Sequence, residues 1–144
     1  MSEESQKRLL QENEFFRREI LPRIEKDSPE NVVYISSSSD TLSDNVVSHE
    51  IYHARFFLNT AYKNAVIDYY NNHLSKDQQK MFEKSVESVG YNPEDRVLMA
   101  NEFQAYMLDA FLVLPNDIPQ IHERENVKKI LRPSFVQFLK EHGF

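Results

Sequence analysis

Apolar residues recur at helical spacing along most of the chain, and this pattern predicts a mainly helical protein. Residues that favour helix ends mark the boundaries: Pro22 ends the first apolar pattern and Gly90 ends the third. Pro133 is expected to interrupt the last helix. The expected helices cover about residues 3–21, 43–72, 75–89, 93–114 and 123–142.

Two of these helices have a clear starting signal. Ser75 is expected to cap the third helix, because its hydroxyl can accept from a backbone N–H of the first turn. Asn92-Pro93-Glu94-Asp95 combines a capping residue, a proline for the first turn and two acids beside the positive end of the helix dipole. The fourth helix is therefore expected to begin at Pro93 and to end near Leu114.

Residues Asn31 to Ser36 have the β-branched and aromatic character of a strand. A single strand cannot satisfy its own backbone hydrogen bonds, so a short sheet is expected, with Arg23 to Lys26 as a second candidate strand. The predicted fold class is therefore α+β and predominantly helical. The length suits one compact domain over residues 1–144, with an N-terminal helix, a short small sheet, a long helix and further helices up to a C-terminal helical region.

The composition excludes several classes of site. The two glycines, Gly90 and Gly143, are too far apart for the glycine-rich loop of a phosphate or dinucleotide site. The absence of cysteine excludes disulfides, cysteine-based zinc fingers, iron–sulfur clusters and cysteine nucleophiles. A formal net charge of −6 argues against a nucleic-acid partner. The longest apolar run, Ala110 to Leu114, is far too short to span a membrane, so a cytoplasmic protein without a membrane partner is expected.

The expected long helix carries His49-Glu50-Ile51-Tyr52-His53, the His-Glu-x-x-His pattern of zinc metallopeptidases. This spacing places the two histidines one turn apart on the same helix face, so that both imidazoles can bind one ion. Glu50 projects to the side, where its carboxylate can reach a water on the ion without being a ligand. Two solvated histidines on a surface helix are the alternative interpretation of the same residues.

A catalytic zinc ion needs a third protein ligand. A third histidine two turns after the motif is absent, since Phe56 and Asn59 occupy the relevant positions. The other option is an acid from a later helix, and Asn101-Glu102 in the fourth helix supplies one. Through these residues, segment 43–112 of the chain resembles the gluzincin metallopeptidases.

This resemblance implies a zincin-like domain that binds Zn²⁺ through His49, His53 and Glu102, with Glu50 as the general base. It also implies a strand beside the motif helix, here Val32 to Ser36, along which an extended peptide could add as a further strand. The family builds this region on a sheet of several strands, whereas this chain offers one clear strand.

Two further residues of the fourth helix share the face of Glu102. Tyr106, one turn on, can hydrogen-bond the oxyanion formed when water attacks an amide; the alternative is a core tyrosine whose hydroxyl is satisfied. Asp109, two turns on, can orient a histidine or remain a solvated surface acid. Thermolysin-type members have an aspartate one turn after the ligand glutamate, where this chain has Tyr106.

These residues predict zinc-dependent hydrolysis of a peptide or protein substrate. The ion would polarise the scissile carbonyl and acidify its bound water, and Glu50 would take the proton and pass it to the leaving amine. Two alternatives stay open. One is a zinc-binding interaction module of the same ancestry that is catalytically weak or inactive. The other is a helical interaction protein in which His49 and His53 are incidental. The sequence does not indicate an oligomeric state.

Overall fold

The structure, a computed structural model, describes Arg18 and residues 44–109 and 119–144. All of these except Arg18 belong to one unit of the chain, Val33–Phe144. The prediction of one domain over residues 1–144 involves residues outside the described ranges and stays a prediction. The described elements are α3 (Asp44–Leu58), α4 (Thr60–Asp68), the π-helix η2 (Tyr69–His73), α5 (Lys76–Ser85), the 3₁₀-helix η3 (Glu87–Val89), α6 (Arg96–Leu108) and α7 (Pro119–Glu141).

The predicted α+β class is wrong, because the part of the chain that the structure describes is helical and has no strand or sheet. The expectation rested on Asn31–Ser36 and on residues 23–26, and both segments lie outside the described residues. The predicted helix over residues 3–21 also lies outside them, apart from Arg18. Within the described ranges the apolar residues follow a helical spacing, and these ranges form helices. They therefore contain no second strand with which the expected strand could pair.

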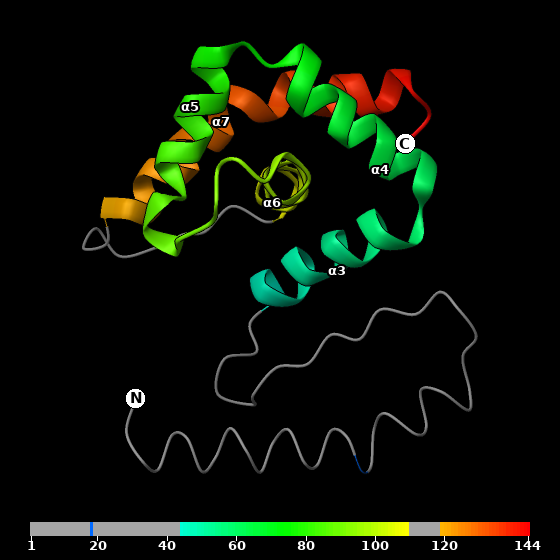
Figure 1. The fold of residues 1–144 in the computed structure, drawn as a ribbon, viewed down its shortest axis with the longest axis horizontal. Coiled ribbons are helices and arrows are strands. Elements are labelled where there is room, and N and C mark those ends of the chain that lie inside the picture. Colours follow the sequence, from blue (N-terminus) through cyan, green and yellow to red (C-terminus); the bar gives the residue numbers. More distant parts are fainter. Residues whose placement is uncertain (1–17, 19–43, 110–118) are drawn as a thin grey trace. The chain divides into compact units, whose positions relative to one another are not determined.

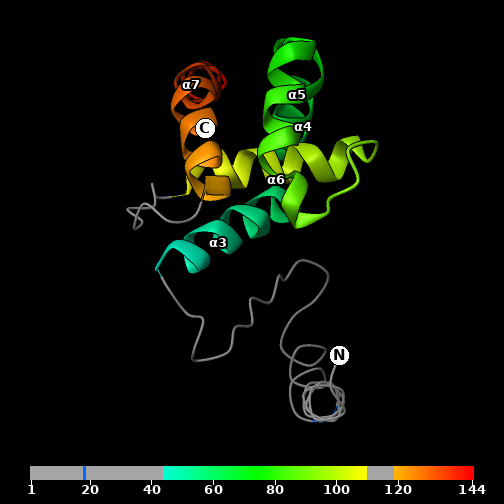
Figure 2. The same ribbon diagram turned by 90° about the vertical axis from the view of Figure 1, so that its left-hand side faces the viewer.

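Helix α6 is the centre of the described fold. Figure 1 shows it along its axis, and Figure 2 shows α3 on one side of it and α4, α5 and α7 on the other. Residues Met99 to Ala105 and Met107 are all buried, as expected of a helix that has neighbours on every side. Three of these buried residues are polar, namely Asn101, Glu102 and Gln104, so their hydrogen-bonding groups need partners inside the protein.

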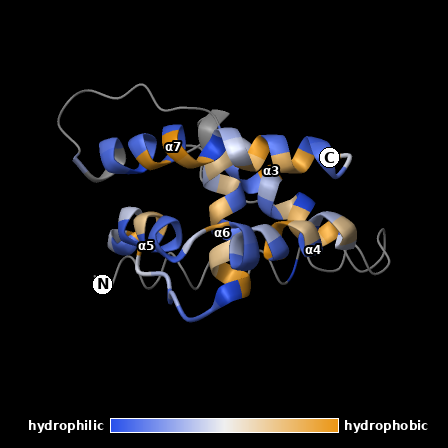
Figure 3. Cartoon of the chain, turned by 90° about the horizontal axis from the view of Figure 1, so that it is seen from above, coloured by the Kyte–Doolittle hydropathy of each residue, from blue (hydrophilic) through white to orange (hydrophobic). Residues whose placement is uncertain are grey.

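An aromatic core anchors α6 to the helices opposite α3. Phe103 lies at its centre, with four ring centroids between 5.2 and 6.0 Å away, those of Tyr69, Tyr70, Phe82 and Phe135. Figure 3 shows apolar and polar residues alternating around the turns of α7, which contributes Phe135 to this core. Burial of each such ring contributes about 1.5–3 kcal/mol, so this side of α6 is firmly held.

The predicted helix over residues 43–72 is divided at Asn59. The backbone of Asn59 is extended (φ −119°, ψ 100°), and its side-chain oxygen accepts from the Tyr62 N–H at 3.0 Å. Asn59 is therefore the N-cap of α4, and α3 ends before it. An asparagine side chain can replace a backbone group in a hydrogen bond and so begin a new helix. The spacing of apolar residues does not show such a break.

The predicted cap of α5 is confirmed. The Ser75 hydroxyl accepts from the Gln78 N–H at 3.2 Å, and the Gln78 side chain accepts from the Ser75 N–H at 2.8 Å, which completes a capping box. Gly90 follows η3 with a φ of 88°, a left-handed conformation that favours glycine.

Helix α6 begins three residues later than predicted. Asp95 is its N-cap and accepts from the Leu98 N–H at 2.9 Å. The side chain of Asn92 instead accepts from the Glu94 N–H at 3.1 Å and closes a turn before the helix. The helix ends at Leu108, and the predicted continuation to about Leu114 falls within residues 110–118, which lie outside the described ranges.

Helix α7 begins at Pro119 and continues through Pro133, so the predicted interruption there is wrong. Pro133 lacks the N–H that would pair with the carbonyl of Lys129, but both residues are exposed, so water can satisfy that carbonyl. Neither α7 nor any other described helix has an apolar stretch long enough to cross a membrane.

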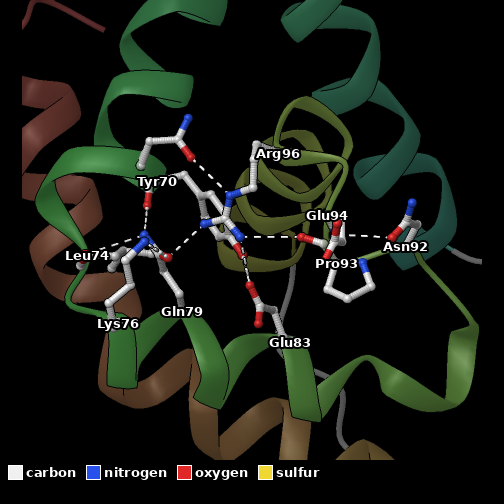
Figure 4. Close-up of polar contacts among 10 residues, drawn as sticks. Tyr70, Leu74, Lys76, Gln79, Glu83, Asn92, Pro93, Glu94 and Arg96 are labelled. Carbon is white, nitrogen blue, oxygen red and sulfur yellow. Dashed lines mark hydrogen bonds and ion pairs between the residues drawn. The ribbon is translucent and has the colours of Figure 1, made fainter.

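The start of α6 is fixed by Arg96, as Figure 4 shows. Its guanidinium donates to Glu83 at 3.0 Å, to Gln79 at 2.7 Å and to Asn71 at 3.3 Å, and lies 4.9 Å from the ring centroid of Tyr70. One side chain thereby joins α6 to α5 and to η2. The planar fork makes several hydrogen bonds at once, which a lysine ammonium cannot reproduce with the same geometry.

We predict that Arg96→Met lowers the free energy of unfolding by about 1–2 kcal/mol, since it removes a partly exposed ion pair, several hydrogen bonds and a cation–π contact. Denaturant unfolding followed by circular dichroism measures the loss. Lys80→Met, an exposed position on α5, is the matched control and should change little. Equal stability of the two variants would show that Arg96 does not hold α6.

Candidate metal centre

The structure brings together the three predicted metal ligands. His49 and His53 lie one turn apart on α3, and Glu102 faces them from α6. The Glu102 Oε2 atom lies 3.7 Å from His49 Nε2 and 3.6 Å from His53 Nε2, and the possible ligand atoms all lie within 4.8 Å of one another. Two ligands bound to one tetrahedral zinc ion at about 2.0–2.1 Å are about 3.4 Å apart, so small side-chain movements suffice to bind one.

The other nitrogen of each imidazole is held by a residue of α6. His49 Nδ1 donates to Asp109 Oδ2 at 3.0 Å, and His53 Nδ1 donates to Asn101 Oδ1 at 2.9 Å. These hydrogen bonds orient the rings and direct both Nε2 atoms toward Glu102. Partners of this kind are typical of histidines that bind metals. Of the two interpretations of Asp109, the structure supports the one in which it orients a histidine.

The partner of His53 is itself held by buried groups. The Gln104 side chain donates to Asn101 Oδ1 at 3.2 Å, and the Tyr62 hydroxyl donates to Gln104 Oε1 at 2.9 Å. Gln104 and Tyr62 are both fully buried. The orientation of His53 is therefore fixed by a hydrogen-bond chain that reaches α4 through α6.

Glu102 is the exception among the buried polar residues of α6. Its Oε2 atom is buried and has no hydrogen-bond partner among the described residues, since 3.6–3.7 Å is too long for a hydrogen bond from either imidazole. Asn101 and Gln104, by contrast, each have a partner. The buried oxygen of these three side chains that lacks a partner among residues 44–109 and 119–144 is thus the one that faces both histidines.

The electrostatics of the site favour a positive charge beside Glu102. Burial lowers the pKa of His49, but the hydrogen bond to Asp109 and the nearby Glu102 carboxylate raise it more, to about 9. The imidazole side chains of His49 and His53 are 16% and 15% exposed, so the site is small but not closed to solvent.

Tyr106 lies against the site. Its ring centroid is 4.6 Å from that of His49, and its hydroxyl accepts from Arg124 Nη1 of α7 at 3.3 Å. Burial raises the pKa of the neighbouring Tyr91 hydroxyl, and the nearby Tyr106 hydroxyl and Glu102 carboxylate raise it further. These contacts agree with the interpretation of Tyr106 as a partly buried tyrosine with a satisfied hydroxyl, and its catalytic role stays a prediction.

Glu50, the predicted general base, is half-buried on α3 and forms no hydrogen bond or ion pair with the described residues. Its position between the two histidines in sequence places it to the side of the face that they share. Its role as a base stays a prediction.

Comparisons with protein-family models, with curated proteins and with solved structures find no match to the chain. The resemblance to gluzincins therefore rests on the sequence motifs, and the structure adds that His49, His53 and Glu102 form a group that could hold a metal ion.

Sequence reasoning missed three residues that build this site. Asn101 stands in the sequence beside Glu102 as a polar residue in an apolar stretch, and this signal could have identified it. Tyr91, in the loop before α6, and Lys128, on α7, carry no such signal, because only the packing of α6 against its neighbours brings them close.

We predict that the stability of the chelator-treated protein falls as the pH rises from about 6.5 to 9. The folded-state pKa of His49 is raised from 6.5 to about 9, so its stabilising contribution is complete below 6.5 and is lost as the pH passes 9. The loss should be roughly 2 kcal/mol, less than the full linkage value because solvent screens the partly exposed imidazole. Urea unfolding at several pH values with EDTA measures it.

The control is His49→Gln, in which this part of the pH dependence should disappear. An unfolding free energy that is equally pH-dependent in wild type and variant would contradict the assignment to His49.

Proposed function

We propose that the chain is a zinc-dependent peptide hydrolase in which His49, His53 and Glu102 hold the ion. The observation that most supports this is the buried Oε2 atom of Glu102, which has no hydrogen-bond partner in the described part of the chain and faces both Nε2 atoms. Proteins rarely bury an acceptor without a partner, because its lost hydration costs about 1–3 kcal/mol. A cation among these three atoms provides the missing partner.

The donor set favours zinc among the common cations. Two imidazole nitrogens and one carboxylate are the ligands of one well-known class of catalytic zinc site, whereas magnesium and calcium prefer oxygen ligands alone. When bound, zinc supplies Lewis acidity, which polarises a peptide carbonyl and makes water a stronger acid.

The residues of the chain have distinct proposed roles. Asp109 and Asn101 hold the imidazoles through their Nδ1 atoms, so that both Nε2 atoms are aimed at the ion. The Glu50 carboxylate accepts the proton of the attacking water and passes it to the leaving amine, and it is not engaged by any of the described residues. Tyr106 donates to the developing oxyanion, and the hydrogen bond that its oxygen accepts from Arg124 strengthens it as a donor.

One observation favours the second candidate, a zinc-binding interaction module without turnover. A peptidase of this kind needs an edge for extended substrate, and no strand is present among residues 44–109 and 119–144. The expected edge, Val32–Ser36, lies outside the described residues. Metal content and hydrolysis must therefore be measured separately.

We predict that the untagged protein contains about one zinc ion per chain, and that Glu50→Gln keeps this zinc while losing hydrolysis of an unfolded protein such as casein by at least about 100-fold. Elemental analysis measures the zinc, and release of acid-soluble peptides measures hydrolysis. Glu87→Gln, an exposed acid in η3, is the matched control and should keep both properties.

The two possible negative results exclude different candidates. A protein that is purified and reconstituted without binding zinc contradicts both candidates. A protein that binds zinc but shows no chelator-sensitive hydrolysis contradicts the enzyme and supports the interaction module.

A further inference from the structure

Lys128 of α7 is a buried lysine at the edge of the candidate metal centre. Its side chain is 2% exposed, and its ammonium forms an ion pair with Asp109 Oδ1. The other oxygen of the same carboxylate accepts from His49 Nδ1 at 3.0 Å. Lys128, Asp109 and His49 therefore form one continuous chain of charged contacts from α7 to the motif helix α3.

Asp109 needs such a partner because of its place in the fold. It is the C-cap of α6, where ψ is 166° and the backbone leaves the helix, although its N–H still donates to the Ala105 carbonyl at 3.0 Å. Helix geometry therefore no longer restrains the residue on its C-terminal side. A carboxylate at a helix end is normally solvated there, and the dipole at that end is unfavourable to a negative charge.

The burial of Lys128 is also informative. Lysine is almost never fully buried unless its charge is paired, because removal of an ammonium from water is costly. A hydrophobic residue would fill a buried position on α7 at no such cost. The pairing with Asp109 thus favours a role for Lys128 beyond packing.

We propose that Lys128 is a positioning residue of the metal centre: it holds Asp109 in the orientation in which that carboxylate accepts from His49 Nδ1 and directs His49 Nε2 at the ion. This inference rests on the proposed zinc site, but not on hydrolysis. By this inference, α7 contributes to metal affinity although it supplies none of the three proposed ligands.

A purely electrostatic effect of Lys128 has the opposite sign. The ammonium and a divalent cation repel each other, so removal of the charge alone should tighten metal binding. Loss of positioning should weaken it, and partners of this kind typically contribute 10- to 100-fold to metal affinity. The direction of the change therefore distinguishes the two effects.

The test is the zinc dissociation constant of the full chain, measured by competition with a chromophoric chelator. Lys128→Met, which keeps the length and apolar stem of the side chain, should weaken zinc binding about 10-fold, whereas Lys128→Arg should restore affinity to within a few-fold of wild type. Lys129→Met is the matched control, because Lys129 is the exposed neighbour on the same helix, and it should leave the affinity unchanged. Circular dichroism of each protein in EDTA verifies that it is folded.

A double-mutant cycle tests whether Lys128 acts through Asp109. Asp109→Ala should also weaken zinc binding about 10-fold or more, and addition of Lys128→Met to that variant should then change the affinity less than about two-fold. The absorption spectrum of the Co²⁺-substituted protein gives a second readout, since a misplaced imidazole alters the bands of a tetrahedral site.

Three results would overturn the inference: unchanged or tighter zinc binding by Lys128→Met, additive effects of Lys128→Met and Asp109→Ala, or a Co²⁺ spectrum that neither substitution alters. A wild-type protein that binds no zinc overturns the proposed function as well. If wild type and Lys128→Met bind zinc with the same affinity, this inference alone is overturned.

Discussion

The contact between α3 and α6 is the constraint on which the candidate site depends. It is fixed at two points by hydrogen bonds from imidazole Nδ1 atoms, from His49 to Asp109 and from His53 to Asn101. Asn101 lies within α6 and Asp109 is its C-cap, so the two hydrogen bonds join the helices at two separate points and set how they face each other. With both Nδ1 atoms engaged, the Nε2 atoms can face only the space beside Glu102. The geometry of the candidate metal centre thus follows from how two helices are joined.

The burial of α6 explains why this contact is so polar. A helix with neighbours on every side has to bury whatever polar residues it carries, and buried polar groups need partners. Tyr62 from α4 satisfies Gln104, and α3 and α7 satisfy Asn101 and Asp109. Glu102 Oε2 stays without a hydrogen bond among the described residues. The aromatic core around Phe103 and the contacts of Arg96 hold the rest of α6 firmly enough to tolerate that unsatisfied oxygen.

The sequence indicated which three side chains come together better than it predicted the fold around them. The spacing of His49 and His53 determines that they share a helix face, and the helical pattern around Glu102 made it a reasonable third ligand. The inferred sheet failed because it came from one short segment, and the single long helix failed because Asn59 caps a new one. The roles of Asn101, Tyr91 and Lys128 depend on which helices pack together. Periodicity within one helix does not contain that information.

X-ray absorption at the zinc edge of the untagged, zinc-loaded protein tests the central claim most directly, because it reports the atoms that surround the ion. Convergence of His49, His53 and Glu102 predicts a four-coordinate shell of nitrogen and oxygen at about 2.0–2.1 Å, with the outer scattering of two imidazoles. In the double variant His49→Ala, His53→Ala that imidazole scattering should vanish. A six-coordinate shell of oxygen atoms, or imidazole scattering that persists in the double variant, would contradict the account.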